Sequence, residues 1–261
     1  MDRLKALLTL IRVRHTGQVV GIVTVLSVKR HGFSVQSLLA IAAFLFLSIA
    51  LFSLDDAHDS VGDRLIHPKR PIPSGAFTIK QVYLIGTLFL CLGLASASSL
   101  SFQQFVAFLV VAILGFAVIF LKITSILRAI LTASMIFLLF PFSMAVSFKS
   151  LLFGLIVALP HVAGSITKDI IHREGDERVG LQPPAYWTRY VASGLFFLCG
   201  GVVLLPIVFK LVSWLYMVLI VPTFVSCLVL GYNVLNREYP KVYIYGGIGM
   251  LSALVAFSIN G

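Results

Sequence analysis

Apolar segments follow one another along this chain, and each is about as long as a helix that crosses a lipid bilayer. The hydrocarbon core of a bilayer requires about 20 apolar residues of helix. With 59% hydrophobic and only 11% charged residues among 261, the chain is too apolar for a soluble domain of this length. We therefore expect one all-α, polytopic membrane domain over residues 1–261. The nine expected spans are 6–28, 34–54, 78–98, 103–121, 126–147, 150–171, 190–209, 211–232 and 242–259.

The basic residues between these spans predict an orientation. Of the 20 Lys and Arg residues, 16 fall on one side of the expected bundle, and only Lys29, Arg30, Lys149 and Lys210 fall on the other. Positive charge in short loops collects on the cytoplasmic side of a membrane. We expect a multi-pass protein of the cell membrane with a cytoplasmic N-terminus and a C-terminus on the outside.

The net charge of +10 does not indicate nucleic-acid binding, because the basic residues are dispersed over short loops and form no patch on a soluble domain. Anionic lipid head groups or an anionic substrate are the expected partners. Cys91, Cys199 and Cys227 lie singly within apolar segments, without the spacing of a zinc site or a disulfide framework. We interpret them as packing residues. The sequence leaves the oligomeric state open.

Eight of the ten acidic residues form two groups, each at the expected cytoplasmic end of an apolar segment. The groups are Asp55, Asp56, Asp59 and Asp63, and Asp169, Glu174, Asp176 and Glu177. A spacing of three and then four residues occurs in both, as Asp56-x-x-Asp59-x-x-x-Asp63 and as Asp169-x-x-His172-x-x-x-Asp176. In a helix these steps place side chains on one face.

Crowded carboxylates at the C-terminal end of a helix repel one another and are opposed by the helix dipole. A bound cation relieves both effects, and ligand sets made only of oxygen favour Mg²⁺ or Ca²⁺ over zinc. Solvated interfacial charges are the simplest alternative, but two groups with one spacing argue against it. An ion-coupled transporter is a non-enzymatic alternative, weakened because acidic residues are missing from the middle of the expected spans.

The first acidic group and the loop after it resemble a signature of the UbiA-type intramembrane prenyltransferases. The run from Asp55 to Asp63 resembles the NDxxDxxxD motif of that family. The stretch HPKRPIPSG, from His67 to Gly75, resembles a loop that is common in its archaeal-lipid members. The family's second signature is similar to KDIIHREGDERVGL, from Lys168 to Leu181.

This resemblance implies a nine-helix bundle with a central cavity that opens to the cytoplasmic side. It implies transfer of a prenyl group from an isoprenoid diphosphate, with two Mg²⁺ ions held by the two motifs. The metal ligands are then Asp56, Asp59, Asp63, Asp169 and Asp176. The substrate-binding residues are Asp55, Arg12, His15, Arg64, Arg70, Lys122, Lys168, His172 and Arg178. Direct roles in catalysis fall to Asp59, Asp176 and Lys122.

Three departures from the family pattern bear on the substrate. Asp55 stands where the family usually has Asn, and His172 replaces the middle aspartate of the second motif. A tyrosine often found one turn before the lysine that matches Lys122 is not evident in GFAVIFLK. We expect His172 either to hydrogen-bond the diphosphate when protonated or to bind metal when neutral, and favour the first because Mg²⁺ prefers oxygen.

The acceptor is the least determined part of this hypothesis. The HPKRPIPSG loop and the EGD sequence favour a lipid acceptor, as in the archaeal enzyme that joins geranylgeranyl diphosphate to geranylgeranylglyceryl phosphate. An aromatic acceptor of quinone biosynthesis is the second alternative. A UbiA-type terpene cyclase, which uses the diphosphate without any acceptor, is the third.

Overall fold

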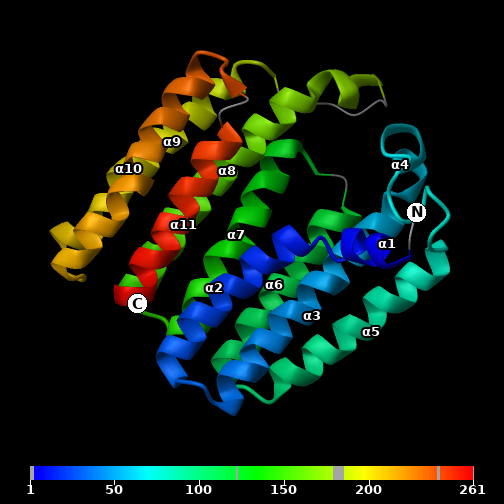
Figure 1. Cartoon of the computed structure of the whole chain (residues 1–261), viewed down its shortest axis with the longest axis horizontal. Helices are drawn as coiled ribbons and strands as arrows, with labels where there is room; N and C mark the ends of the chain where they lie inside the picture. The colour runs from blue at the N-terminus through cyan, green and yellow to red at the C-terminus, as the bar shows by residue number, and fades with distance from the viewer. Residues whose placement is uncertain (1–2, 122, 179–184, 240–241, 261) are drawn as a thin grey trace. The chain divides into compact units, whose positions relative to one another are not determined.

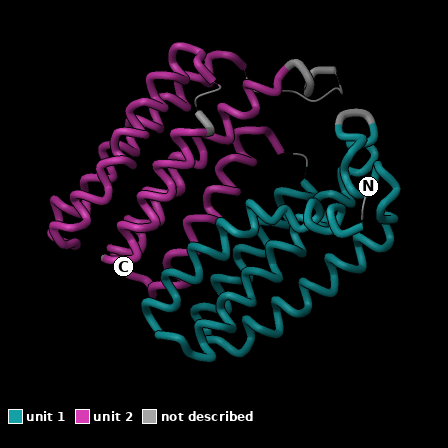
Figure 2. The backbone as a smooth tube through the Cα atoms, in the orientation of Figure 1, with its two compact units in different colours: residues 1–122 teal, residues 123–261 magenta. Residues whose placement is uncertain are grey.

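The structure is a computed structural model that describes residues 3–121, 123–178, 185–239 and 242–260. Within these ranges all regular secondary structure is helical (Figure 1). The helices are α1 (Arg3–Leu10), α2 (Val13–His31), α3 (Val35–His58), α4 (Ser60–Ile66), α5 (Ile79–Ser98), α6 (Phe102–Phe120), α7 (Ser125–Met144), α8 (Phe148–Arg178), α9 (Thr188–Val208), α10 (Trp214–Leu235) and α11 (Val242–Asn260). The chain divides into two compact units, Met1–Lys122 and Ile123–Gly261 (Figure 2).

Helix α3 is the centre of the first unit, because α2, α5 and α6 all pack against it. Small residues allow the close approach. A Cβ atom at Gly115 of α6 would lie 2.5 Å from a methyl group of Leu51, and one at Gly86 of α5 would lie 2.9 Å from Cγ of Leu54. Small residues at such crossings are typical of membrane helices, where van der Waals packing drives association.

In the second unit, α8 packs against α7 and α9, and α10 packs against α9 and α11. Hydrogen bonds from side chains to the backbone cross these interfaces. The Ser193 hydroxyl of α9 donates to the carbonyl oxygen of Gly231 at 2.7 Å, and the Thr223 hydroxyl of α10 donates to that of Gly249 at 2.9 Å. Such bonds satisfy polar groups that the apolar surroundings would otherwise leave unpaired.

Among the described residues, seven helices are long and apolar enough to cross a membrane, which confirms the expected helical fold with several candidate spans. They are α3 and α5 to α10, with α8 counted over Phe148–Arg173. Residues 244–259 of α11 form a shorter apolar helix, and α2 is not among the seven. The count of nine spans therefore stays a prediction.

The expectation of one continuous helix over residues 6–28 is wrong. The chain breaks after α1, and α2 begins at Val13. At the break, Arg12 has a left-handed backbone (φ 44°, ψ 58°), which is costly for any residue with a Cβ atom. The hydrogen bonds that its side chain donates to Asp55 and Asp56 at the end of α3 offset the cost of this backbone conformation.

The break expected at Lys210 is confirmed. Helix α9 ends at Val208, α10 begins at Trp214, and Lys210 itself has a φ of 54° in the segment between them. Helices occupy the other expected ranges as well, although α8 continues beyond residue 171 to Arg178. Apolar runs and polar interruptions are local features of the sequence, which is why these positions could be predicted.

Candidate functional site

The first acidic group lies where α3 gives way to α4. Helix α3 ends at His58, and Asp59 caps it. The helical hydrogen bonds nevertheless continue through Asp59: its N–H donates to the Asp55 carbonyl oxygen at 2.9 Å, and the Asp63 N–H donates to the Asp59 carbonyl oxygen at 3.0 Å. Asp56 and Asp63, two turns apart, are both buried. The Asp59 side chain, which lies between them in the sequence, is exposed.

Arg12 joins the two carboxylates at the end of α3. Its Nη2 atom lies 2.8 Å from Oδ2 of Asp55 and 2.6 Å from Oδ1 of Asp56. The guanidinium also lies over the ring of Phe52, 5.0 Å from the ring centroid. Because Asp56 is buried, this pairing supplies the positive charge that a buried carboxylate requires.

Arg70, from the loop after α4, completes the cluster. Its Nη1 atom lies 2.5 Å from Oδ2 of Asp63 and 3.9 Å from Oδ1 of Asp56. One nitrogen of a cation thus stands beside carboxylates of both helices. Asp56 contacts both arginines, since the same oxygen accepts from Arg12.

The HPKRPIPSG loop that carries Arg70 is held in a defined conformation. The Arg70 N–H donates to the His67 carbonyl oxygen, and the Ser74 N–H donates to the Arg70 carbonyl oxygen, both at 3.0 Å. Ile72 is buried among Leu10, Ala57 and Val82 of α1, α3 and α5. The loop is therefore packed onto the first unit.

The residues present fit Mg²⁺. Asp55, Asp56 and Asp63 offer carboxylate oxygens, the donors that this ion prefers, and guanidinium nitrogens already occupy positions between them. In the described part of the chain, no three His, Cys, Asp or Glu side chains could hold one metal ion by themselves. In proteins, Mg²⁺ is commonly bound by one or two carboxylates, with waters and substrate oxygens as the other ligands.

The second acidic group lies on α8, which continues without a break to Arg178. Asp169 is half-buried, and Lys168 and His172 are exposed. The guanidinium of Arg173 lies over the ring of Tyr186, 4.4 Å from its centroid. The side chains of Asp176 and Arg178 lie outside the described residues, so their predicted roles stay predictions.

The other predicted substrate-binding residues have varied positions. His15 is exposed on α2, with its ring edge-on to Phe52 at a centroid distance of 6.1 Å. Arg64 is exposed on α4. Lys122 lies outside the described residues. Arg12 and Arg70 contact the first acidic group. Both were predicted to bind substrate, whereas their pairing with the acids was not predicted.

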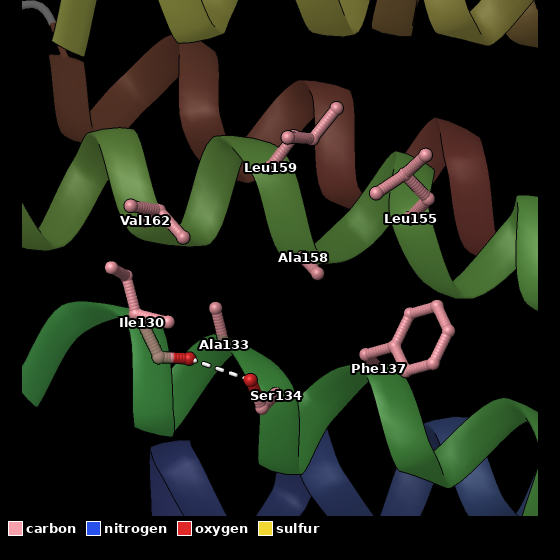
Figure 3. A pocket seen from close by; sticks show the side chains of 8 residues that line it. All are labelled: Ile130, Ala133, Ser134, Phe137, Leu155, Ala158, Leu159 and Val162. Carbon is pink, nitrogen blue, oxygen red and sulfur yellow. Dashed lines mark hydrogen bonds between the residues drawn. The ribbon is translucent and has the colours of Figure 1, made fainter. Parts of the chain in front are cut away.

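An apolar groove lies between α7 and α8 in the second unit (Figure 3). Its volume is about 190 Å³. The one polar lining residue, Ser134, donates its hydroxyl to the Ile130 carbonyl oxygen at 2.9 Å, so its hydrogen-bonding donor is used within α7. The groove is lined by Ile130, Ala133, Ser134, Phe137, Leu155, Ala158, Leu159 and Val162. Such a surface suits a hydrocarbon chain, and the sequence reasoning did not identify it.

Known proteins resemble the chain over most of its length. Digeranylgeranylglyceryl phosphate synthase from Haloquadratum walsbyi is 28% identical in an alignment 201 residues long, which covers 70% of this chain and 68% of that protein. A solved structure of a digeranylgeranylglyceryl phosphate synthase superposes with a TM-score of 0.79 at 20% identity, covering 99% of each chain.

A UbiA homologue from Archaeoglobus fulgidus, solved with DMAPP and Mg²⁺, gives a TM-score of 0.71 at 17% identity, covering 97% of this chain and 98% of that one. These structural similarities concern the fold. The sequence model of a protein family also matches this chain, over residues 19–242. The match runs from α2 through both acidic groups to the start of α11. That match settles the classification: the chain belongs to the UbiA prenyltransferase family.

Proposed function

We propose that this prenyltransferase moves a geranylgeranyl group from its diphosphate to the hydroxyl of a lipid acceptor, geranylgeranylglyceryl phosphate, in a Mg²⁺-dependent reaction. The buried carboxylates of Asp56 and Asp63, held with Arg12 and Arg70 at the end of an apolar helix, carry the proposal. A site of this kind can hold a polyanion through cations on the protein side. The similarity to the Haloquadratum walsbyi synthase supports the choice of acceptor.

The reaction breaks the bond between C1 of the prenyl chain and the diphosphate oxygen, and the diphosphate leaves with the electron pair. The acceptor's hydroxyl oxygen forms the new bond to C1, and its proton passes to solvent or to the departing diphosphate. Mg²⁺, when bound, neutralises the charge that develops on the leaving group. Arg12 and Arg70 orient the diphosphate by charge-assisted hydrogen bonds, as guanidinium groups do with phosphates generally.

The residues we assign to magnesium are Asp56, Asp59, Asp63, Asp169 and Asp176, with two ions as in the sequence-based expectation. Lys122, Lys168, Arg64 and His15 are assigned to the diphosphate or the acceptor. The apolar groove between α7 and α8 is assigned to the isoprenoid chain, because its lining offers hydrocarbon contacts and its one hydroxyl is used within the helix. An apolar site also excludes water, which would otherwise capture the allylic cation.

We further infer nine membrane spans in a single domain, with the N-terminus and the mouth of the site on the cytoplasmic side. The uneven distribution of Lys and Arg among the loops supports this orientation. A cytoplasmic mouth suits a substrate whose diphosphate head is water-soluble while its tail is soluble in lipid.

One experiment separates the candidate reactions. The purified protein is incubated with geranylgeranyl diphosphate and Mg²⁺, alone, with geranylgeranylglyceryl phosphate, or with an aromatic acid, and the products are identified by mass. We expect a product only with the glyceryl phosphate lipid. Diphosphate consumed without any acceptor would instead indicate a cyclase, and an aromatic product would overturn the lipid assignment.

A further inference from the structure

A second pocket, separate from the apolar groove, lies within the first unit between α1 and the HPKRPIPSG loop. Its volume is about 360 Å³, and its lining residues are Thr9, His67, Pro68, Lys69 and Arg70. Three of the five carry nitrogen donors, and none carries a carboxylate. We propose that this pocket binds the phosphomonoester group of the acceptor lipid, with Lys69 as the residue that recognises it. The inference rests on the proposed function.

Lys69 is the available cation of this pocket. Its side chain is exposed, and among the described residues no ion pair or hydrogen bond engages its ammonium group. Arg70, in contrast, already shares its charge with Asp63 and Asp56. An anion entering the pocket therefore meets one uncommitted positive charge at Lys69, and a second that is partly neutralised.

Hydrogen bonds and packing hold the wall of this pocket in place. The His67 N–H donates to the Asp63 carbonyl oxygen at 2.8 Å, which ties the start of the loop to α4. The Thr9 hydroxyl donates to the Lys5 carbonyl oxygen at 2.8 Å, so that side chain is fixed on α1. Buried Ile72 anchors the far side of the loop. The backbone is therefore held on both sides of Lys69 in the sequence, at His67 and at Ile72.

Arg70 connects this pocket to the acidic group, since it lines the pocket and its Nη1 atom lies 2.5 Å from Oδ2 of Asp63. A ligand in the pocket is then separated from the carboxylates by a single side chain. In a glyceryl phosphate, a carbon neighbouring the phosphate ester carries the hydroxyl. Holding the phosphate at Lys69 therefore keeps the reacting hydroxyl close to the group that we assign to the metal.

A phosphomonoester fits this lining better than the carboxylate of an aromatic acid. It carries about −1.5 to −2 charges near neutral pH and has three acceptor oxygens, as phosphorylated side chains do. Lys69 and His67 supply several donors for such a group. The pocket accordingly selects for an acceptor that bears phosphate.

The test compares Lys69→Ala with the conservative variant Lys69→Arg and with Lys80→Ala, a matched control at another exposed lysine of the first unit. With saturating geranylgeranyl diphosphate and varied geranylgeranylglyceryl phosphate, we expect Lys69→Ala to raise the acceptor's KM by roughly tenfold, the loss of one charge-assisted contact. We expect kcat and the KM of the diphosphate to stay unchanged. Lys69→Arg should restore most of the acceptor's KM, and Lys80→Ala should match the wild type.

A second readout does not depend on turnover. Glycerol phosphate, the acceptor's head without its chain, should raise the melting temperature of the wild type by binding the folded protein, and should raise that of Lys69→Ala less. If the wild type transfers no prenyl group but shows this Lys69-dependent rise, the proposed function fails and the phosphate pocket stands. Equal rises in wild type and Lys69→Ala, or an unchanged KM of the acceptor, would overturn the pocket.

A bilayer lipid could supply the same phosphate chemistry, and nanodiscs separate the two sources. The assay is repeated in phosphatidylcholine alone and in phosphatidylcholine with phosphatidic acid. We expect the KM difference between wild type and Lys69→Ala in both membranes. If the difference appears only with phosphatidic acid present, the pocket binds a lipid head group, and its assignment to the acceptor is wrong.

Discussion

The two acidic groups share one spacing, but their surroundings differ. In the first unit, Asp56 and Asp63 are buried and paired with Arg12 and Arg70. In the second, Asp169 is half-buried on a continuous α8, and the exposed His172 stands at the middle position. The spacing of a motif therefore fixes which helical positions carry its residues, while segments distant in sequence decide how those residues are neutralised.

The units differ in a further respect that bears on the substrate. The described part of the first unit contains the basic pocket at Lys69, whereas the second contains the apolar groove between α7 and α8. We assign them to different substrates, the basic pocket to the phosphate of the acceptor and the apolar groove to the isoprenoid chain of the diphosphate. The predictions below test these separate roles.

Removal of divalent metal should have the largest effect. Excess EDTA should lower turnover at least about a thousandfold, because the metal supplies the main stabilisation of the leaving diphosphate. The melting temperature should change little, since Arg12 and Arg70 already pair with Asp55, Asp56 and Asp63 without metal. Turnover and thermal unfolding are measured on the same samples, with added Mg²⁺ as the restoring control. Full activity in EDTA would exclude the metal hypothesis.

Asp59→Ala and Asp176→Ala should each lower kcat by about a hundredfold or more, since each acidic group is assigned metal ligands. Neither substitution should unfold the protein. Asp59 is exposed, so its loss should cost less than about 0.5 kcal/mol of unfolding free energy. Steady-state kinetics at saturating diphosphate provide the measurement.

Asp56→Asn is the contrasting variant in the first unit. It removes a buried carboxylate that both arginines approach, and should cost about 1–2 kcal/mol in stability besides activity, a value discounted because the arginines are partly exposed. Equal stability of Asp56→Asn and Asp59→Ala would show that the ion pairs contribute little.

Near wild-type turnover in either Asp59→Ala or Asp176→Ala would remove that residue from the site.

The apolar groove gives a smaller, substrate-selective effect. Ala158→Phe should partly fill it and raise the KM of geranylgeranyl diphosphate by roughly tenfold, since a few methylene contacts are worth about 1–2 kcal/mol. The KM of the shorter geranyl diphosphate should rise less. Ala95→Phe, at an exposed position of α5, is the matched control. If both substrates respond equally, the groove does not hold the chain.

Local sequence patterns predicted the spans in the middle of the chain closely. The segment expected at 78–98 is α5 at Ile79–Ser98, and that expected at 103–121 is α6 at Phe102–Phe120. Both helices begin at a Thr or Ser whose hydroxyl accepts from the backbone three residues on, a short-range signal.

The break at Arg12 could not be predicted in this way. It depends on bonds to Asp55 and Asp56, which lie 43 and 44 residues further along the chain. Contacts between residues distant in sequence also explain why the site was only partly predicted. The motif identified the acidic residues, but the pairing of Arg70 with Asp63 and the pocket around Lys69 arise only when the loop packs on α1 and α4.

His172 should give the smallest effect, and it tests whether the departure in the second acidic group matters. Its side chain is exposed on α8, three residues after the half-buried Asp169. We expect His172→Ala to raise the KM of the diphosphate by about two- to fivefold, as for one solvent-exposed polar contact, and to leave the melting temperature unchanged.

His172→Asp, which restores the residue usual in the family, is the informative partner of that variant. If His172 donates a hydrogen bond to the diphosphate, His172→Asp should raise the KM of the diphosphate more than His172→Ala does at limiting Mg²⁺, because the carboxylate repels the substrate. At high Mg²⁺ the KM of His172→Asp should fall back toward that of the wild type, because the carboxylate can then act as a metal ligand. The KM of the diphosphate is therefore measured for wild type, His172→Ala and His172→Asp over a range of Mg²⁺ concentrations. Three coinciding profiles would show that His172 takes no part in the site, and that the acidic group on α8 works through its aspartates alone.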